Sequence, residues 1–405
     1  MEFVVGTFNG QDLYALRFEP SSSKTPNAAL TIVRANPAIG GHSWLALSPN
    51  KKYLYCTAWT KPTPSIAAYK IRDGGRHINY INAKHVKNLS GYVCCSQTHV
   101  YSVGGATGEV YRIGPDGGLE DMVQELDFVD PQSENMSEQR GEVPHGDFAG
   151  LRHGAHSCDL SPDGKSLYVA DIGRNCIWTY TVNAKYGPYQ PRLQIGNWTS
   201  NEQPSGREVE HLELAHKHLA PRSHDGPRHT WPHPNGRILY SLQEHSSMVD
   251  VFTVAEDGVT LSHKQGVKII PADKNCTNYW ADEVRLSTGP NPLTPRYMYA
   301  STRGLTAETK GYVAVFKLDE DGTMADENAI CIWETPTSGG IANAIEPAPW
   351  HTSHCGMEFL ALTDSEEGWV FVLSFDGNEV KEVSRVNLGK TDDGDVVGAA
   401  TAVWL

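Results

Sequence analysis

The chain has 405 residues, and its 34 Lys and Arg against 48 Asp and Glu give a formal net charge of −14 at pH 7. This length suits two or three average domains or one large β architecture. The acidic balance argues against a nucleic-acid partner, and no apolar run approaches the roughly 20 residues of a membrane span. The first residues lack the pattern of a secretion signal. We therefore expect a cytoplasmic protein whose eight Cys are free thiols.

One strand–turn–strand pattern recurs along the chain. An alternating strand leads into Ser/His-Pro-Asn/Asp-x-Lys/Arg, and a second strand containing Leu-Tyr follows. Clear copies begin at Trp44, Cys158 and Thr230, and looser copies begin at Glu283 and Ala344. Pro sets φ in such a turn, and the Asp or Asn side chain bonds its own backbone. Each copy therefore predicts a β-hairpin.

The spacing of these hairpins predicts the fold. Hairpins at intervals of about 50 to 60 residues are typical of propeller blades, and 405 residues at that period give about seven. We predict one all-β domain over 1–405, a seven-bladed β-propeller, in preference to an unrelated pair of β-sandwiches. Strands over 3–8 and 13–18 would close the ring beside 401–405 and remove the sheet edge.

Two stretches interrupt the rhythm. One, at about 120–150, is rich in acidic residues, and the other, at 200–229, contains five His. We predict that both are long loop insertions, and that they project from the face that holds the site. Within the second, 208–220 predicts a short helix.

Motifs for metal, phosphate or nucleophile chemistry are absent. The chain has no G-x-S-x-G, no complete Walker loop, no G-x-G-x-x-G, no HExxH and no CxxC pair. A metal site would have to use His211, His216 and His218 with Glu208, but their spacing matches no standard site. We therefore favour a His-rich surface helix and expect no metal.

Ionisable residues recur where the predicted blades would face the central channel. Each lies just before a hairpin or just after its Leu-Tyr strand, and the set is His153, His156, Arg228, Glu244 and Arg303. Two guanidinium groups with an imidazole and a carboxylate suit an anionic small-molecule substrate that undergoes proton transfer.

Residues 334–370, with ETPTSGG and EEGW, and residues 296–318 closely resemble fungal 3-carboxy-cis,cis-muconate cyclases, within the broader 6-phosphogluconolactonase-like propeller family. The opening VVGTFNGQDLYALRF, the SPDGKSLYVAD blade and the PRHTWPHPNGRILYSLQE blade are also similar, so the resemblance spans nearly the whole chain. It implies that the catalytic residues are His156, Arg228, Arg303 and Glu244. We expect the substrate to be bound by His153, Trp44, Asn343 and Ser338.

The resemblance implies an intramolecular cyclisation without metal or cofactor. A substrate carboxylate oxygen would add to a conjugated double bond, and Arg228 and Arg303 would stabilise the enolate-like charge. Either His156 or Glu244 would deliver the proton to carbon, and a His fits best because its unperturbed pKa lies near neutral pH. The alternatives are a lactone hydrolase of the 6-phosphogluconolactonase type and a non-catalytic propeller used as a binding platform.

The chain departs from the pattern of these cyclases at three places. An early His-Pro-Arg element is missing around Leu89, a His is replaced by Ile341, and an Asn is replaced by Thr401. A site that loses polar groups and gains an apolar one should accept a less charged, larger substrate. The tricarboxylate substrate therefore stays open, and a cyclase in a secondary-metabolite pathway is a variant of the same hypothesis.

Overall fold

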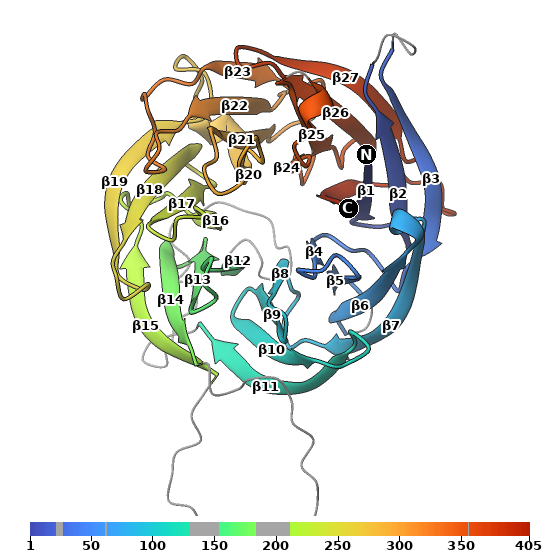
Figure 1. Ribbon diagram of the computed structural model, residues 1–405, viewed down its shortest axis with the longest axis horizontal. Helices are drawn as coiled ribbons and strands as arrows, with labels where there is room; N and C mark the ends of the chain where they lie inside the picture. The colour runs from blue at the N-terminus through green and yellow to red at the C-terminus, as the bar shows by residue number, and fades with distance from the viewer. Residues whose placement is uncertain (22–26, 61–62, 129–153, 184–210, 355) are drawn as a thin grey trace, which may run out of the picture.

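The computed structural model describes residues 1–21, 27–60, 63–128, 154–183, 211–354 and 356–405. Within these residues, 28 strands form seven antiparallel four-stranded sheets, which are arranged in a ring (Figure 1). The predicted all-β seven-bladed propeller is confirmed.

In six of the blades the strands run outward from the ring centre in chain order. The first three of these blades are β4 (Leu45–Leu47), β5 (Tyr53–Ala58), β6 (Ser65–Arg72) and β7 (His77–His85); β8 (Tyr92–Cys95), β9 (His99–Gly104), β10 (Thr107–Ile113) and β11 (Leu119–Asp127); and β12 (Ala155–Leu160), β13 (Ser166–Asp171), β14 (Cys176–Val182) and β15 (Leu212–Leu219). The next three are β16 (Pro227–Pro232), β17 (Ile238–Gln243), β18 (Met248–Val254) and β19 (Leu261–Lys268); β20 (Tyr279–Leu286), β21 (Tyr297–Gly304), β22 (Tyr312–Lys317) and β23 (Cys331–Glu334); and β24 (Ile345–Pro347), β25 (Glu358–Thr363), β26 (Trp369–Phe375) and β27 (Val380–Asn387). Short 3-10 turns are η1 (Asp73–Gly75), η4 (Cys276–Asn278) and η5 (Thr352–His354).

The seventh blade joins the two ends of the chain. Its order is β28 (Ala399–Trp404), β1 (Glu2–Thr7), β2 (Asp12–Glu19) and β3 (Ala29–Pro37), so the innermost strand comes from the C-terminal side (Figure 1). Phe3 lies opposite Trp404, and the two rings pack with centroids 4.4 Å apart. The predicted closure is confirmed, and it leaves neither β1 nor β28 as a free edge.

The inner hairpins are held by the turn chemistry that the sequence predicts. In the turn between β12 and β13, the Ser161 hydroxyl donates to Asp163 Oδ1 at 2.7 Å, and the same oxygen accepts the main-chain N–H of Lys165 at 3.1 Å. Gly164 follows at φ 70°, in the left-handed region that glycine tolerates. These bonds turn the chain sharply, so that the first two strands of the blade stay paired.

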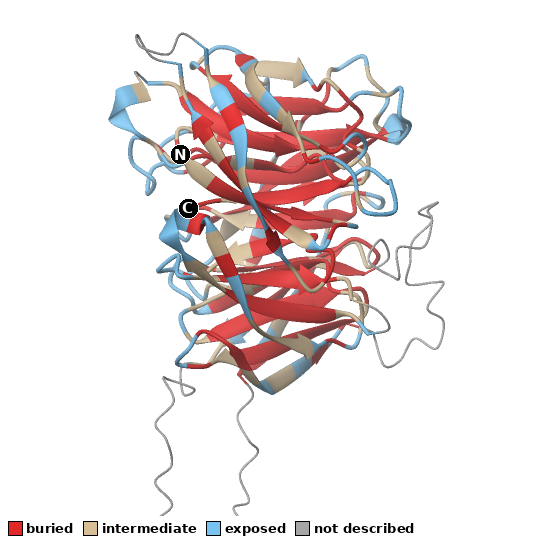
Figure 2. Cartoon of the chain, turned by 90° about the vertical axis from the view of Figure 1, so that its right-hand side faces the viewer, coloured by how far each residue is buried: buried red, intermediate tan, exposed pale blue. Residues whose placement is uncertain are grey.

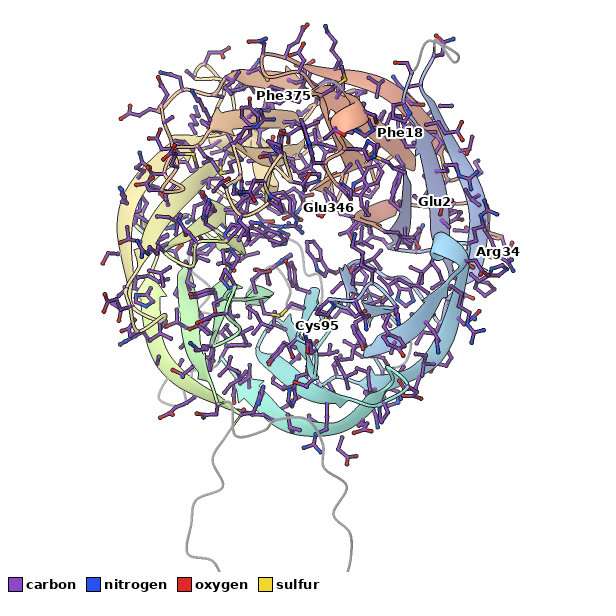
Figure 3. The ribbon with its side chains drawn as sticks, viewed as in Figure 1. Glu2, Phe18, Arg34, Cys95, Glu346 and Phe375 are labelled. Carbon is purple, nitrogen blue, oxygen red and sulfur yellow. The ribbon has the colours of Figure 1, made fainter. Side chains whose placement is uncertain are left out.

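Burial follows the position of each strand in its blade. The second and third strands are mostly buried, whereas the residues of the outermost strands are mostly exposed or half-buried (Figure 2). Aromatic side chains fill the space between neighbouring blades, and Phe18 and Phe359, for example, pack edge to face at 5.0 Å (Figure 3). The core is therefore a ring of contacts between sheets, and it holds the inner strands in fixed positions.

Parts of both predicted insertions are strands. β11 occupies the start of the predicted insertion at 120–150, β15 lies within the one at 200–229, and β16 begins at the end of the latter. The remaining residues of the two stretches, 129–153 and 184–210, lie outside the described residues.

The predicted helix over 208–220 is wrong, because 212–219 is the outermost strand of its blade. It pairs with β14 from Cys176 opposite Leu219 to Val182 opposite Leu212. Pairing with a preformed strand outweighs the helical preference of Glu, Leu, Ala and Lys in this segment.

No disulfide joins two cysteines in the part of the chain that can be described. Seven Cys are free there, and Cys355 lies outside it. No helix in the same residues is long and apolar enough to cross a membrane.

Candidate active site

A small cavity of about 60 Å³ lies where the inner strands begin, and we call it the front cavity. Its wall contains the ionisable side chains of His156, Arg228, Glu244, Asp282 and Arg303. It also contains apolar residues, namely Phe8, Trp44, Trp59, Ile341, Ala342 and Ala344. The cavity therefore offers both charged groups and a nonpolar surface to one ligand.

Three of the ionisable side chains sit at β-bulges. The pairing register shifts between Ala155 and Ser157, between Pro227 and His229, and between Ala281 and Glu283. The residues at these shifts are His156, Arg228 and Asp282. A bulge places an extra residue in one strand and re-aims its side chain. The same device in three successive blades thus directs an imidazole, a guanidinium and a carboxylate into one cavity.

The other two ionisable groups come from the ends of second strands. Glu244 directly follows β17, and its main-chain N–H donates to the Gly226 carbonyl at 2.8 Å. Arg303 lies near the end of β21, where its guanidinium carbon is 4.9 Å from the ring centre of Trp280. Because second strands run antiparallel to inner strands, their ends meet the beginnings of the inner strands at this cavity.

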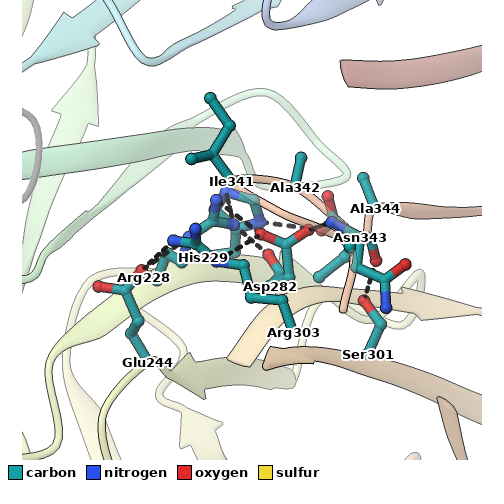
Figure 4. Close-up of polar contacts among 12 residues, drawn as sticks. Arg228, His229, Glu244, Asp282, Ser301, Arg303, Ile341, Ala342, Asn343 and Ala344 are labelled. Atoms are coloured by element: carbon teal, nitrogen blue, oxygen red, sulfur yellow. Dashed lines mark hydrogen bonds and ion pairs between the residues drawn. The ribbon is translucent and has the colours of Figure 1, made fainter. Parts of the chain in front are cut away.

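The charges form one compact cluster (Figure 4). Glu244 Oε1 lies 3.3 Å from Arg228 Nε and 3.3 Å from Arg303 Nη2. Asp282 Oδ1 lies 2.8 Å from Arg228 Nη2 and 3.8 Å from Arg303 Nε. No side chain of the four is more than 9% exposed. Two cations and two carboxylates balance each other formally, so the cluster can be buried at tolerable cost.

Burial and the nearby charged side chains determine the protonation states of Glu244 and His156. Burial by itself would raise the pKa of Glu244, but His245, Arg228 and Arg303 outweigh it and hold that pKa well below the usual range. Burial and the charge of Arg228 lower the pKa of His156 well below 6.5. At neutral pH the free protein therefore holds Glu244 ionised and His156 neutral, so the unperturbed pKa of histidine does not apply to His156 in the free protein.

Several atoms in the cluster have no hydrogen-bond partner in the described part of the chain. They are buried and comprise His156 Nδ1, Arg228 Nε, Glu244 Oε2, Arg303 Nε and Thr401 Oγ1. The two Nε atoms and Glu244 Oε2 are in ion pairs that lack hydrogen-bond geometry, whereas Glu244 Oε1 accepts a hydrogen bond from Arg303 Nη2 at 3.3 Å. Buried polar atoms are nearly always bonded in folded proteins, so this concentration marks where a polar ligand would complete the set.

Behind the cavity, two buried residues hold Arg228. Arg228 Nη1 donates to His229 Nε2 at 3.1 Å, so His229 carries its proton on Nδ1 and donates it to Glu283 Oε1 at 2.9 Å. The same Glu283 oxygen lies 2.5 Å from Arg285 Nη1. Burial raises the pKa of Glu283 to about 7. Arg228 is thus oriented by a carboxylate acting through an imidazole.

Most of the residues singled out from the sequence meet at the front cavity. His156, Arg228, Glu244, Arg303 and Trp44 all line it, as do two of the three positions that depart from the cyclase pattern, Ile341 and Thr401. Leu89 is not part of its wall.

Two of the predicted substrate-binding residues do not line the front cavity, and a third falls outside the described residues. Asn343 is fully buried, and it donates its main-chain N–H to Asp282 Oδ2 at 2.5 Å and its side-chain amide to the Thr302 carbonyl at 2.9 Å, so it positions Asp282. Ser338 lines a neighbouring cavity. His153 lies outside the described residues.

Asp282 and the His229–Glu283 pair were not foreseen. All three lie in inner strands at or next to a bulge, in the segments PRHTW and YWADEV. The available signal was an ionisable residue within the predicted inner strand, as in the segments that carry His156 and Arg228.

The His residues considered for a metal site do not converge. His211 Nε2 bonds the Tyr101 hydroxyl at 2.9 Å, and His218 Nε2 bonds the Val259 carbonyl at 2.9 Å on the outer face of its blade. His216 lies beside Thr260, and Glu208 is outside the described range. In the residues that can be described, no group of three or more His, Cys, Asp or Glu could hold a metal ion.

The fold and this site define a lactonase-type propeller. The chain belongs to the family described as lactonase, 7-bladed beta-propeller, which matches residues 2–335. The structure of the periplasmic gluconolactonase PpgL of Pseudomonas aeruginosa has the same fold, with a TM-score of 0.70 at 16% identity, covering 99% of this chain and 98% of that one.

Two curated relatives are more specific. The chain is 40% identical to muconate cycloisomerase 1 of Cutaneotrichosporon cutaneum, over 100% of this chain and 98% of the relative. It is 27% identical to the carboxy-cis,cis-muconate cyclase of Neurospora crassa, over 73% of this chain and 66% of the relative. The resemblance noted in the sequence is confirmed. These relatives support an enzyme of the lactonising cyclase type, with a lactonase as the alternative.

Proposed function

We propose that the protein is a cycloisomerase that converts a conjugated cis,cis-dicarboxylate of the muconate class into a lactone. One observation carries this proposal: two buried guanidinium groups, a carboxylate and an imidazole, several with unused hydrogen-bonding capacity, surround a single small cavity. The full-length similarity to muconate cycloisomerase 1 supports it.

The reaction defines what the site must supply. An oxygen of one carboxylate forms a C–O bond to the nearer carbon of the distant double bond. The π electron pair moves to the next carbon and is delocalised into the second carboxylate as an enolate. That carbon then takes up a proton. A dianion becomes a lactone monoanion, so each turnover consumes one proton.

Arg228 and Arg303 would bind the carboxylate at which the enolate develops. Their contacts to Glu244, at 3.3 Å, are longer than the roughly 2.7–2.9 Å of a strong charge-assisted hydrogen bond. A substrate carboxylate can therefore take over these donors without breaking tight bonds. Donors already fixed where charge grows stabilise the transition state more than the ground state.

His156 would deliver the proton. It is neutral in the free protein, because burial and the Arg228 charge lower its pKa. A bound dianion adds negative charge to a cluster that is otherwise balanced, and it raises the pKa of the imidazole. His156 would thus take up a proton together with the substrate, while Glu244 stays ionised between the two Arg.

The composition of the wall favours a dicarboxylate over a tricarboxylate. Glu244 and Asp282 already offset the charge of both guanidinium groups of the front cavity, so each substrate carboxylate beyond the one that these groups bind adds uncompensated negative charge. Ile341 adds an aliphatic side chain to the same wall, and beside it a carboxylate would lose hydration without compensation.

The test follows diene absorbance in weakly buffered solution with a pH indicator. With cis,cis-muconate we expect loss of the diene band together with proton uptake, also in the presence of EDTA, and a much weaker response to 3-carboxy-cis,cis-muconate. A lactone hydrolase would leave the diene intact, open added lactones and release protons. No response from the folded protein to muconates would reject the cycloisomerase.

A further inference from the structure

Ile341 stands between two cavities. The front cavity, of about 60 Å³, and a second cavity, of about 330 Å³, share Ile341 and Arg303 in their walls. We call the second one the side cavity. Its wall also contains Trp280, Leu305, Thr306, Ala307, Ser338 and Glu366. The larger space thus begins on the far side of one aliphatic side chain.

The backbone fixes Ile341 in this position. Gly339 and Gly340 precede it at φ 87° and 67°, and a Cβ on Gly340 would lie 2.5 Å from Ser365 Oγ. The N–H of Ile341 donates to that same hydroxyl at 2.7 Å, and the Gly340 carbonyl accepts from Arg303 Nη1 at 3.2 Å. Because this turn is tied both to Ser365 and to Arg303, the side chain of residue 341 decides how far the two cavities communicate.

We propose that the side cavity is a subsite for an uncharged substituent on the dicarboxylate chain, and that Ile341 limits the size of that substituent. This inference rests on the proposed function. Leu305 and Ala307 offer apolar surface, and Thr306 and Ser338 offer hydroxyl groups. Arg303, the one cation in the described wall, is paired with Glu244, and Glu366 adds negative charge. Alkyl, halogen or hydroxyl groups fit this wall, whereas a carboxylate does not.

The experiment compares kcat/KM for cis,cis-muconate with kcat/KM for its 2-methyl and 3-methyl derivatives. Discrimination of one methyl group by a tight wall is typically about 10-fold or more. In Ile341→Ala we expect the preference for at least one methyl derivative to rise about 10-fold over the wild-type ratio, and in Ile341→Val to rise less. Ratios that stay at the wild-type value in a folded Ile341→Ala protein overturn the proposal.

A second substitution locates the gained space. Ala307 is an exposed residue in the wall of the side cavity, so Ala307→Phe narrows that cavity without disturbing the core. In the double variant Ile341→Ala/Ala307→Phe, the gain for the methyl derivative should be lost. If the gain persists, the substituent occupies the front cavity and the subsite assignment is wrong.

A binding measurement separates this inference from the proposed function. Calorimetry with adipate and 3-methyladipate, saturated analogues that cannot cyclise, reports the subsite without turnover. Ile341→Ala should favour 3-methyladipate by about 10-fold relative to adipate. A wild-type protein that leaves muconate unchanged would refute the function alone, whereas unchanged relative affinities for the adipates would refute the subsite alone.

Discussion

The two ends of the central channel are built from the same inner strands, yet their charged side chains differ in how far they are hydrogen-bonded within the protein. The rear end holds a larger cavity of about 630 Å³, whose wall includes Arg285, Glu346 and Asp159, and Figure 3 shows Glu346 near the ring centre. The Arg285 guanidinium carbon lies 4.0 Å from the ring centre of Trp231, and its Nε lies 2.7 Å from Glu346.

In three inner strands, a residue of the front cavity is followed three positions later by a residue of the rear cavity. His156 and Asp159 lie in β12, Arg228 and Trp231 in β16, and Asp282 and Arg285 in β20. At the rear, Asp159 accepts hydrogen bonds from Tyr92 and Thr230 at 2.9 and 3.0 Å. At the front, the corresponding side chains keep unbonded atoms. Rear charges therefore stabilise the ring, whereas front charges are arranged for a ligand.

The largest expected effect is at the front. Arg303→Ala should lower kcat/KM for muconate about 1,000-fold, because it removes a donor aimed at the developing enolate. Arg303→Lys should recover only part of the rate, since an ammonium cannot reproduce the planar fork. Steady-state kinetics with a circular-dichroism control measures this. An Arg303→Ala enzyme with a tenth or more of wild-type activity would contradict the assignment.

The matching change at the rear should affect stability. Arg285→Met leaves Glu283 and Glu346 as uncompensated carboxylates, and we expect the free energy of unfolding to fall by about 3–5 kcal/mol. Turnover of the folded variant should fall far less than in Arg303→Ala, because Arg285 reaches Arg228 only through Glu283 and His229. Urea unfolding and kinetics on the same preparation test both parts. Lys51→Met, an exposed change at the same cavity, serves as control and should shift stability by less than about 0.5 kcal/mol. Loss of turnover without loss of stability in Arg285→Met would remove the distinction between the two ends.

A substitution of His156 also tests the difference between the front and rear cavities, because His156 lies at the front and has a proposed chemical role. His156→Gln should lower kcat about 100-fold, the typical contribution of one positioned acid or base, and leave the thermal midpoint nearly unchanged. A variant that loses stability but keeps its rate would assign His156 a structural role.

The pH dependence tests the same residue without mutation. The pKa of His156 in the free protein lies well below 6.5, and above that pKa the protonated fraction falls about tenfold per pH unit. Because the reaction needs that proton, kcat/KM should decrease as pH rises from about 6.5 to 8, and the decrease should disappear in His156→Gln. A level wild-type profile over this range would show that the proton comes from another group.

The smallest expected effect comes from two buried hydroxyls. Thr230 donates to Asp159 at the rear, whereas Thr401 Oγ1 has no hydrogen-bond partner in the described residues at the front. Thr230→Val should cost about 1–2 kcal/mol of stability, and Thr401→Val less than about 0.5. Thermal or urea unfolding of the two variants compares them directly, and equal losses would mean that the front hydroxyl is also structural.

The sequence was sufficient for the ring and for much of the site. The repeated Pro–Asp/Asn turns predict hairpins at a fixed period, and the period gives the number of blades. Residues placed just before or after these hairpins, such as Arg228 and Glu244, therefore had to meet at one end of the channel. The segment 212–219 was wrongly predicted as a helix, because it becomes a strand by pairing with β14. That strand lies far away in the sequence, so the local residue pattern does not reveal the pairing.

The rest of the site depended on features that no local pattern shows. Asp282 was missed because YWADEV resembles an ordinary inner strand, and the bulge that turns the carboxylate into the cavity appears only in the pairing register. The neutral state of His156 was missed because its pKa depends on burial and on Arg228, which comes from the next blade.

The seam between β1 and β28 has a consequence for how the protein can be assayed. Phe8, just after β1, and Thr401, within β28, both line the front cavity, and the Phe8 N–H bonds the Gly398 carbonyl across the seam at 3.0 Å. The pocket is thus assembled from both sides of the joint. Separating β1 from β28 would therefore disrupt the pocket. Loss of turnover would then report that these two strands are no longer paired.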